Sequence, residues 1–270
     1  MFDYHMHTAF SADSRADMDE MVQTAIQQGL KEICFTEHID YDYPDDSIVF
    51  DLDYDAYTKK ITEVQEKYRR DITVKKGVEL GIQPHLFDRY DELMSKTEWD
   101  FVICSMHTVE NKSLHYGEIF EGRTLDQAFE VYYDEFTHCI QHFKEYNILG
   151  HVDLIKRYSH SFVEEKTDNL FHDELAKMFD IIIPEGKGIE LNTSGVRYGL
   201  DHNLAAPDVL RLYHEMGGEV ITVGSDAHRP SEIAFQFKES LALLKDIGFK
   251  YITTFENRKP TFHSIDSLHI

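Results

Sequence analysis

Histidine is unusually frequent in this sequence, with 16 residues in a chain of 270. The pattern His5-x-His7 opens the chain, and Asp226-x-His228 lies near its other end. In an extended strand, residues i and i+2 point to the same face, so each pair could bind one cation or two adjacent ones. Imidazole and carboxylate groups are suitable ligands for Zn, Mn or Fe. The lack of a thiolate among them argues against a structural zinc site.

More histidines and acids stand at the ends of other short apolar runs. They are His38 after Thr36-Glu37, Glu79, His107 after Ser105-Met106, His151 after Gly150, and Asp153. Alone, each is more typical of a hydrogen-bonded surface residue or a salt-bridge partner. Together they predict a multinuclear metal site, because so many imidazoles and carboxylates are costly to assemble without cations. Asp13 could join them or could cap the following helix, since Asp is a good N-cap.

These residues occupy equivalent positions in a repeating pattern of strands and helices. The β-rich runs are 2–5, 32–36, 72–80, 101–105, 148–152, 189–192, 219–224 and 251–255, and amphipathic helices are expected at 18–29, 125–143 and 204–216. Such alternation predicts parallel strands with crossover helices. Seven or eight units favour a closed βα barrel, whose active site lies at the carboxyl ends of the strands, over an open doubly wound sheet. The last run either closes the barrel or lies outside it.

Eight other histidines fall in helices or tails, and no part in the site is expected for them. They are His85, His138, His142, His160, His172, His214, His263 and His269.

The composition of the chain disfavours several classes of function. The chain has 27 Lys and Arg against 50 Asp and Glu, a net charge of −23, which disfavours a nucleic-acid partner. A hydrophobic share of 42% is enough for a substantial core, so we expect one domain over residues 1–270, with 256–270 as a C-terminal tail. No run is apolar enough to cross a membrane, and no signal peptide is evident. The number of cysteines, three, is odd, which favours reduced thiols over disulfides and therefore a location in the cytoplasm.

The order of these motifs resembles the PHP (polymerase and histidinol phosphatase) family. The resemblance runs from Asp3 to about His228, and 3–13 and 192–197 are similar to the stand-alone histidinol-phosphate phosphatases in particular. It implies a distorted (β/α)7 barrel, a TIM-like PHP fold, that holds three divalent metal ions (Zn, Mn or Fe). The ligands it implies are His5, His7, Asp13, His38, Glu79, His107, His151, Asp226 and His228. Glu37 and Asp153 match motif positions too, and we expect them to orient ligand histidines.

The chemistry that follows is hydrolysis of a phosphate monoester. Clustered divalent cations activate a bridging hydroxide, and we expect it to attack phosphorus directly, without a phospho-enzyme. Asp226 and His228 are the candidates for protonating the leaving alkoxide. Arginine binds phosphate bidentately, so Arg157 and Arg197 are candidate phosphate ligands. Each could instead form a surface salt bridge. Arg229 is a third candidate, and the hydroxyl of Tyr116 could donate to phosphate.

The resemblance implies L-histidinol phosphate as the substrate. The acidic, aromatic loop 40–46 could select the amine end of that molecule, or it could simply be a solvated loop. The alternative is a PHP phosphoesterase for another ester: a nucleotide, phosphotyrosine or a nucleic-acid end. A non-catalytic metal-binding domain and a metal-dependent amidohydrolase fit less well, because the ligand set is complete and candidate phosphate arginines are present. Metal identity and oligomeric state stay open.

Overall fold

Seven parallel strands form the centre of the molecule in the computed structural model, which describes residues 1–159 and 171–268. Their order is β1 (Phe2–Asp3), β2 (Glu32–Ile39), β3 (Thr73–Gly81), β4 (Phe101–Ser105), β7 (Ile148–Leu149), β8 (Gly188–Asn192) and β9 (Ile221–Gly224). The sheet curls until its two edges meet, where Met6 pairs in parallel with Ala227 and the Asp226 amide donates to the His5 carbonyl at 2.8 Å. The expected seven-stranded distorted barrel is therefore confirmed over the open sheet.

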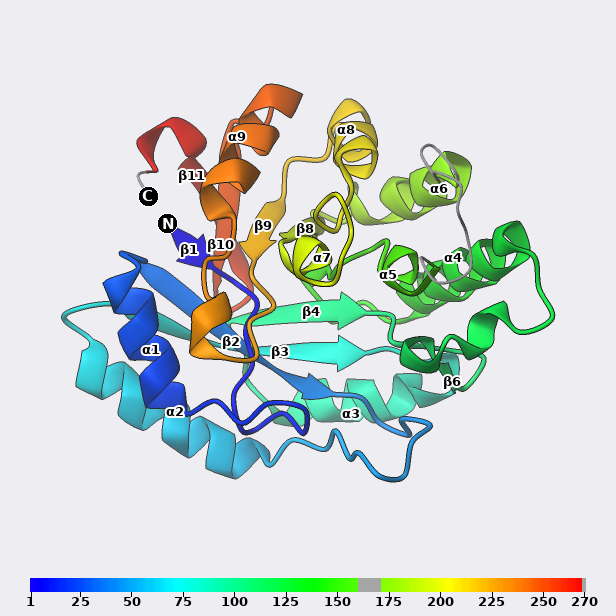
Figure 1. Ribbon diagram of the computed structural model, residues 1–270. Helices are drawn as coiled ribbons and strands as arrows, with labels where there is room; N and C mark the ends of the chain where they lie inside the picture. The colour runs from blue at the N-terminus through cyan, green and yellow to red at the C-terminus, as the bar shows by residue number, and fades with distance from the viewer. Residues whose placement is uncertain (160–170, 269–270) are drawn as a thin grey trace.

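Helices surround this barrel (Figure 1), most of them on its outside and two short ones, 155–159 and 194–197, at the carboxyl ends of the strands. They are α1 (Met18–Gln27), α2 (Tyr54–Tyr68), α3 (Phe87–Lys96), α4 (Leu125–His142), α5 (Ile155–Ser159), α6 (His172–Ile182), α7 (Ser194–Arg197), α8 (Pro207–Glu215) and α9 (Phe237–Ile247). Short 3-10 turns occupy Pro84–Leu86, Leu114–Tyr116, Glu118–Phe120, Pro230–Glu232 and Ile265–Ser267, and a small hairpin joins β5 (Thr108–Val109) to β6 (Lys112–Ser113). No helix in the described part of the chain is both long and apolar enough to cross a membrane.

Helix ends follow local sequence signals, with one difference from expectation at the start of α8. The side chain that caps α1 is Asp17, which accepts from the Glu20 amide at 3.1 Å, so Asp13 is free of that role. The helix expected from residue 204 begins at Pro207, because proline favours the first helical turn and the preceding residues continue as extended chain. For α4, a capping box between Thr124 and Gln127 fixes the expected start.

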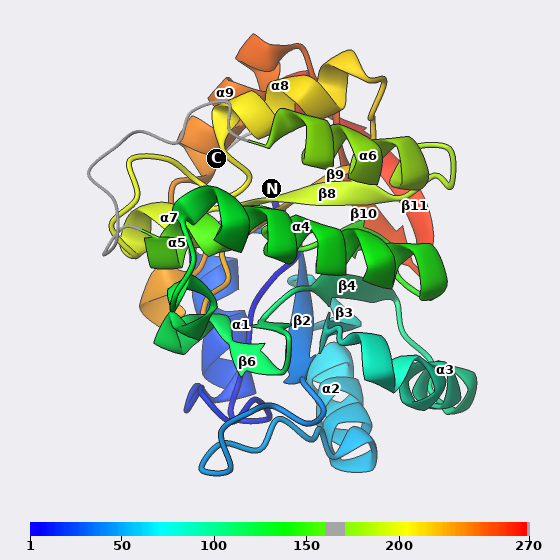
Figure 2. The ribbon, with the colours of Figure 1, turned by 90° about the vertical axis from the view of Figure 1, so that its right-hand side faces the viewer.

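The eighth strand-like run lies outside the barrel. It is β10 (Tyr251–Glu256), which pairs antiparallel with β11 (Lys259–Ser264), so much of the expected tail is a hairpin. Phe255 packs with Tyr4 and Phe101 inside the amino end of the barrel, and the Tyr4 hydroxyl bonds the Phe255 amide at 2.8 Å and its carbonyl at 3.1 Å. The hairpin therefore helps to close the bottom of the barrel and leaves the other end open. Figure 2 views the molecule from the side toward which β2, β3 and β4 point in Figure 1.

Candidate metal centre and active site

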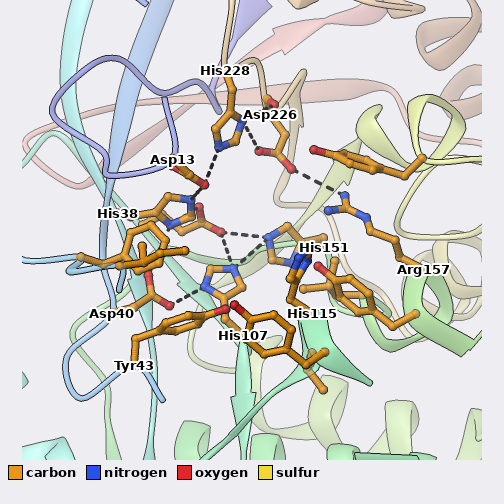
Figure 3. Close-up of a pocket in the computed structure, with 18 of the residues that line it drawn as sticks. Asp13, His38, Asp40, Tyr43, His107, His115, His151, Arg157, Asp226 and His228 are labelled. Atoms are coloured by element: carbon orange, nitrogen blue, oxygen red, sulfur yellow. Dashed lines mark hydrogen bonds and ion pairs between the residues drawn. The ribbon is translucent and has the colours of Figure 1, made fainter. Parts of the chain in front are cut away.

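A cavity of about 540 Å³ opens at the carboxyl ends of the strands (Figure 3). Its inner wall consists of imidazoles and carboxylates, and its outer wall is mainly aromatic. Seven of the nine ligand candidates line this cavity, and His5 and His7 lie fully buried directly behind it. The structure thus brings all nine side chains together from strand ends that are far apart in the sequence.

Glu79, fully buried near the end of β3, is the centre of the cluster. Its carboxylate lies 2.9 Å from His5 Nε2, 3.4 Å from His7 Nε2, 3.3 Å from His38 Nδ1, 3.3 Å from His107 Nε2 and 2.9 Å from His151 Nε2. The Ser105 hydroxyl donates to the same carboxylate at 2.6 Å. One carboxylate from the third strand therefore contacts imidazoles from four other parts of the barrel.

Asp226 and Asp13 complete the other side of the cluster. Asp226 Oδ1 lies 3.6 Å from His7 Nε2 and 3.6 Å from His228 Nδ1. Asp13 Oδ2 lies 3.1 Å from His228 Nε2 and 3.6 Å from His38 Nε2. Asp226 has a φ of +53°, so the chain bends sharply after β9 and returns its carboxylate toward the strand ends.

The donor set fits divalent cations. Four triads have ligand atoms within 4.8 Å of one another: His7, His38 and His228; His5, His151 and Asp226; His5, His7 and Glu79; His38, Glu79 and His107. All donors are nitrogen or oxygen, as Zn, Mn and Fe accept. The buried Nδ1 atoms of His38 and His151 also lack a hydrogen-bond partner within the described residues. The overlap of the triads allows for more than one ion.

Without a cation, this cluster favours positive charge on several of its imidazoles, but not on His7, whose pKa is lowered by burial. Burial opposes a charged ring, yet Asp13 and Glu79 raise the pKa of His38 to about 9. Burial likewise opposes ionisation of Glu79, but the surrounding histidines hold the pKa of its carboxyl well below the usual range. Protons on the imidazoles thus take the place that a divalent cation would fill, so binding such a cation must release them.

Sequence reasoning missed two carboxylates that hold ligand candidates in place. Asp40, just beyond β2 and only 4% exposed, accepts from His107 Nδ1 at 2.6 Å and lies 3.3 Å from His38 Nδ1. Burial works against its charge, but His107 and His38 lower the pKa of Asp40 to about 2. Asp40 is therefore unavailable to bind an amine, which was one of the two roles considered for loop 40–46.

Glu190, in β8, also holds ligand candidates in place, on the other side of the cluster. It accepts from His5 Nδ1 at 2.7 Å and from the His151 amide at 3.1 Å. Both carboxylates lie against glycines, because a Cβ on Gly224 would be 2.2 Å from Glu190 Oε1 and one on Gly81 would be 1.7 Å from Asp40 Oδ1. An acid inside the apolar run 189–192 was the only signal in the sequence.

Glu37 and Asp153 do not touch ligand histidines directly. Glu37 accepts from the Thr8 amide and from the hydroxyls of Thr8 and Ser11, and the Ser11 hydroxyl lies 3.2 Å from His7 Nδ1. Glu37 therefore acts on His7 through Ser11. Asp153 accepts instead from the Ala206 amide at 2.9 Å and lies 3.3 Å from Lys156 Nζ, so it fixes the segment before α8 rather than a histidine.

The two arginine candidates have different surroundings. Arg157, from α5, lines the cavity opposite His38 and Asp40 (Figure 3), with its guanidinium 4.0 Å from the Tyr198 ring and 3.8 Å from Asp226 Oδ2. It also donates to the Ser194 hydroxyl, and its buried Nε has no partner in the described chain. Arg197 does not line the cavity.

Arg197 is occupied by the backbone instead. Its two terminal nitrogens donate to the carbonyls of Ser225 at 2.6 Å and Asp226 at 2.8 Å. The sharp bend that carries Asp226 is thus held by Arg197, and the part of Arg197 in phosphate binding stays a prediction. Arg229 lines the cavity mouth, with its Nε 3.0 Å from Glu232.

Tyr116 and the other histidines lie farther from the cluster. Tyr116 lines the outer cavity, is 52% exposed and donates its hydroxyl to Asp45. The histidines for which no role was expected, His85, His138, His142, His172, His214 and His263, are absent from the cavity lining, and His160 and His269 lie outside the described residues. His115, the neighbour of Tyr116, also lines the outer cavity, although no role was predicted for its own side chain.

Comparisons with known proteins agree with this geometry. The histidinol-phosphatase of Lactococcus lactis is 29% identical over 264 residues, which cover 95% of each chain. A probable histidinol-phosphatase of Clostridium acetobutylicum is 30% identical over 260 residues, 96% of this chain and 98% of the relative. The crystal structure of the Lactococcus lactis histidinol phosphate phosphatase, complexed with Zn, L-histidinol and phosphate, has a TM-score of 0.86 at 28% identity and covers 96% of this chain and 98% of that chain.

The family model of the PHP domain matches residues 3–194, which include seven of the nine ligand candidates. The relatives match over nearly their whole lengths, and the barrel and strand-end cluster have the arrangement that the motifs indicate. This chain therefore belongs to the PHP domain family.

Proposed function

We propose that this protein is a metal-dependent phosphatase that hydrolyses L-histidinol phosphate to L-histidinol and inorganic phosphate. The observation that carries the proposal is the convergence of nine nitrogen and oxygen donors beside one cavity that also contains Arg157. The similarity in sequence and structure to a phosphatase complexed with Zn, L-histidinol and phosphate supports this substrate.

The metal centre of this proposal holds three divalent cations, Zn, Mn or Fe. The residues that would bind them are His5, His7, Asp13, His38, Glu79, His107, His151, Asp226 and His228. Bound cations would supply Lewis acidity toward phosphoryl oxygens and would lower the pKa of a coordinated water. The hydroxide so formed would attack phosphorus directly, without a phospho-enzyme.

The protein's own residues bind the phosphate and supply a proton. Arg157 neutralises phosphoryl charge from the side opposite His38, and Ser194 holds its guanidinium. Asp226 and His228, which both line the cavity, are the candidates for passing a proton to the leaving alkoxide.

Other features agree with a small-molecule substrate in the cytoplasm. A net charge of −23 repels a nucleic-acid backbone. The buried, free cysteines Cys34, Cys104 and Cys139 suit a reducing compartment. We further propose that residues 1–270 act as one barrel domain.

The direct test measures metal content and phosphate release together. The purified protein should contain two to three divalent metals per chain, and kcat/KM for L-histidinol phosphate should far exceed the values for p-nitrophenyl phosphate and a nucleoside monophosphate. Bound metals with preferred turnover of the nucleotide would favour the alternative, a PHP phosphoesterase for another ester. Absence of both metal and turnover would contradict the proposal.

Replacement of Arg157 and of Arg197 by alanine should impair different properties of the protein. Arg157→Ala removes a charged donor from the phosphate, so kcat/KM should fall by roughly 10²–10³-fold with metal content unchanged. Arg197→Ala frees the bend at Asp226, so it should lower metal content. Mass spectrometry of bound metal and steady-state kinetics separate the two. A raised KM with full metal content in Arg197→Ala would instead show that Arg197 binds phosphate.

Asp40→Asn should weaken metal binding, because Asp40 orients His107 and contacts His38. Loss of such an orienting carboxylate typically costs about 10–100-fold in metal affinity. Asp42→Asn is the matched control, since Asp42 is exposed and pairs with His85 and Arg89 outside the cavity. Competition with a chromophoric chelator measures both affinities, and equal affinities in the two variants would exclude this role for Asp40.

The metal-free protein should lose stability on both sides of a mildly acidic optimum. The pKa of His38 is raised from 6.5 to about 9, so its stabilisation is complete below pH 6.5 and is lost as the pH rises toward 9. The pKa of Glu79 is lowered from 4.5, so its stabilisation is lost as the pH falls below that value. Urea unfolding in the presence of a chelator should give the highest free energy between about pH 5 and 6.5; a free energy that rises from pH 6.5 to 9 would contradict this.

A further inference from the structure

Two opposite charges, those of Arg157 and Asp226, lie close together in the wall of the cavity (Figure 3). Nη2 of Arg157 is 3.8 Å from Asp226 Oδ2, and the two side chains are only 11% and 9% exposed. Water screens such a pair weakly, so its attraction is strong. The separation is nevertheless roughly 1 Å longer than that of a direct charged hydrogen bond. Other contacts must therefore hold the guanidinium away from the carboxylate.

The side chain that contacts both charges is Ser194. Its hydroxyl accepts from Arg157 Nη2 and lies 3.1 Å from Asp226 Oδ2. The same hydroxyl lies 2.6 Å from Asn192 Oδ1, and Asn192 Nδ2 is 3.4 Å from Asp226 Oδ2. A serine hydroxyl has one proton, so it donates to one of these oxygens at a time, but it can accept from Arg157 in either case. Ser194 is therefore the bridge between the arginine and the aspartate.

The position of this bridge is fixed by the start of α7. Ser194 is fully buried and is the first residue of that helix. Its amide donates to Asn192 Oδ1 at 2.9 Å, and its carbonyl accepts from the Tyr198 amide at 3.1 Å. The ring of Tyr198 in turn lies 4.0 Å from the guanidinium of Arg157. Arg157 is thus held by two neighbouring side chains of one short segment.

Arg157 keeps donors free while Ser194 holds it. A guanidinium has five N–H groups, and the buried Nε of Arg157 has no hydrogen-bond partner within the described residues. A direct ion pair with Asp226 would turn the guanidinium toward the candidate metal ligands. It would then compete with the phosphate for Arg157 and with the cations for Asp226.

We propose that Ser194 is a positioning residue, whose hydroxyl holds Arg157 where it binds phosphate and keeps it from pairing directly with Asp226. This inference rests on the proposed function and goes beyond it. Ser194 is absent from the cavity lining in the described chain, so it acts through Arg157 rather than by contact with the substrate.

Ser194→Ala removes the hydroxyl and allows Arg157 to move onto Asp226. The inhibition constant of inorganic phosphate should rise about 10-fold or more, and kcat/KM for L-histidinol phosphate should fall by a similar factor, because a hydrogen bond to a charged group is lost. Metal content, measured by mass spectrometry after loading with excess metal, should equal that of the wild type. A crystal structure of the variant should show the guanidinium within about 3 Å of the Asp226 carboxylate.

A matched pair of variants separates the hydroxyl from the volume of the side chain. Ser194→Thr and Ser194→Val introduce side chains of nearly the same shape, but only threonine keeps the hydroxyl. We expect kcat/KM of Ser194→Thr to be about 10-fold higher than that of Ser194→Val. Thr193→Val is the control, because Thr193 is also fully buried but its hydroxyl has no partner within the described residues. This control should change kcat/KM less than about twofold.

A double variant tests whether Ser194 acts through Arg157. When Arg157 is already alanine, Ser194→Ala should lower kcat/KM less than about threefold, because no guanidinium remains to be held. A role of Ser194 in the fold alone would give the same factor with and without Arg157. Circular dichroism establishes that each variant is folded.

The outcomes separate this inference from the proposed function. If the wild-type protein hydrolyses L-histidinol phosphate, but Ser194→Ala has no effect, loses metal or acts independently of Arg157, the positioning role is wrong and the function stands. If the wild-type protein prefers another phosphate ester and the Ser194 variants weaken phosphate inhibition as expected, the inference stands and the proposed substrate is wrong. If the wild-type protein neither hydrolyses a phosphate ester nor binds inorganic phosphate, both are overturned.

Discussion

A fully buried carboxylate, that of Glu79, contacts five imidazoles within 3.4 Å, and the rest of the site follows from this constraint. A charge so far from water needs compensating charge close by. Protonated histidines supply it in the metal-free protein, and divalent cations would supply it with greater strength. In either state the barrel must bring many side chains to one point and hold them there.

The barrel meets this need with carboxylates and glycines behind the imidazoles. Asp40 and Glu190 each fix the Nδ1 side of a histidine, which leaves Nε2 directed at the cluster. Both carboxylates fit only because Gly81 and Gly224 lack side chains. Arg197 likewise holds the bend at Asp226, because its guanidinium donates to two backbone carbonyls there. The positions of the candidate metal ligands thus depend on residues that are not ligands themselves.

The sequence predicts the features of this arrangement that local interactions determine, and it does not predict those that tertiary packing determines. His5 and His7 could be placed because strand periodicity sets where neighbouring side chains point, and the seven-strand barrel followed from the βα alternation. The direction of the Arg197 guanidinium could not, since it depends on the positive φ of Asp226, a feature of tertiary packing. Asp40 looked like an exposed loop acid, and only the fold shows it buried against His107. The strand β10 was expected, with its place inside or outside the barrel left open, but its partner β11 was missed, because that segment is largely exposed and was read as a tail.

The central claim is that these strand ends hold a multinuclear metal centre. Crystals of the zinc-loaded protein, measured above and below the zinc absorption edge, test it most directly. The account predicts two or three anomalous peaks inside the cluster, between Glu79, Asp226 and the histidines around them. No peak there, or zinc bound only at surface histidines such as His138 and His142, would contradict it.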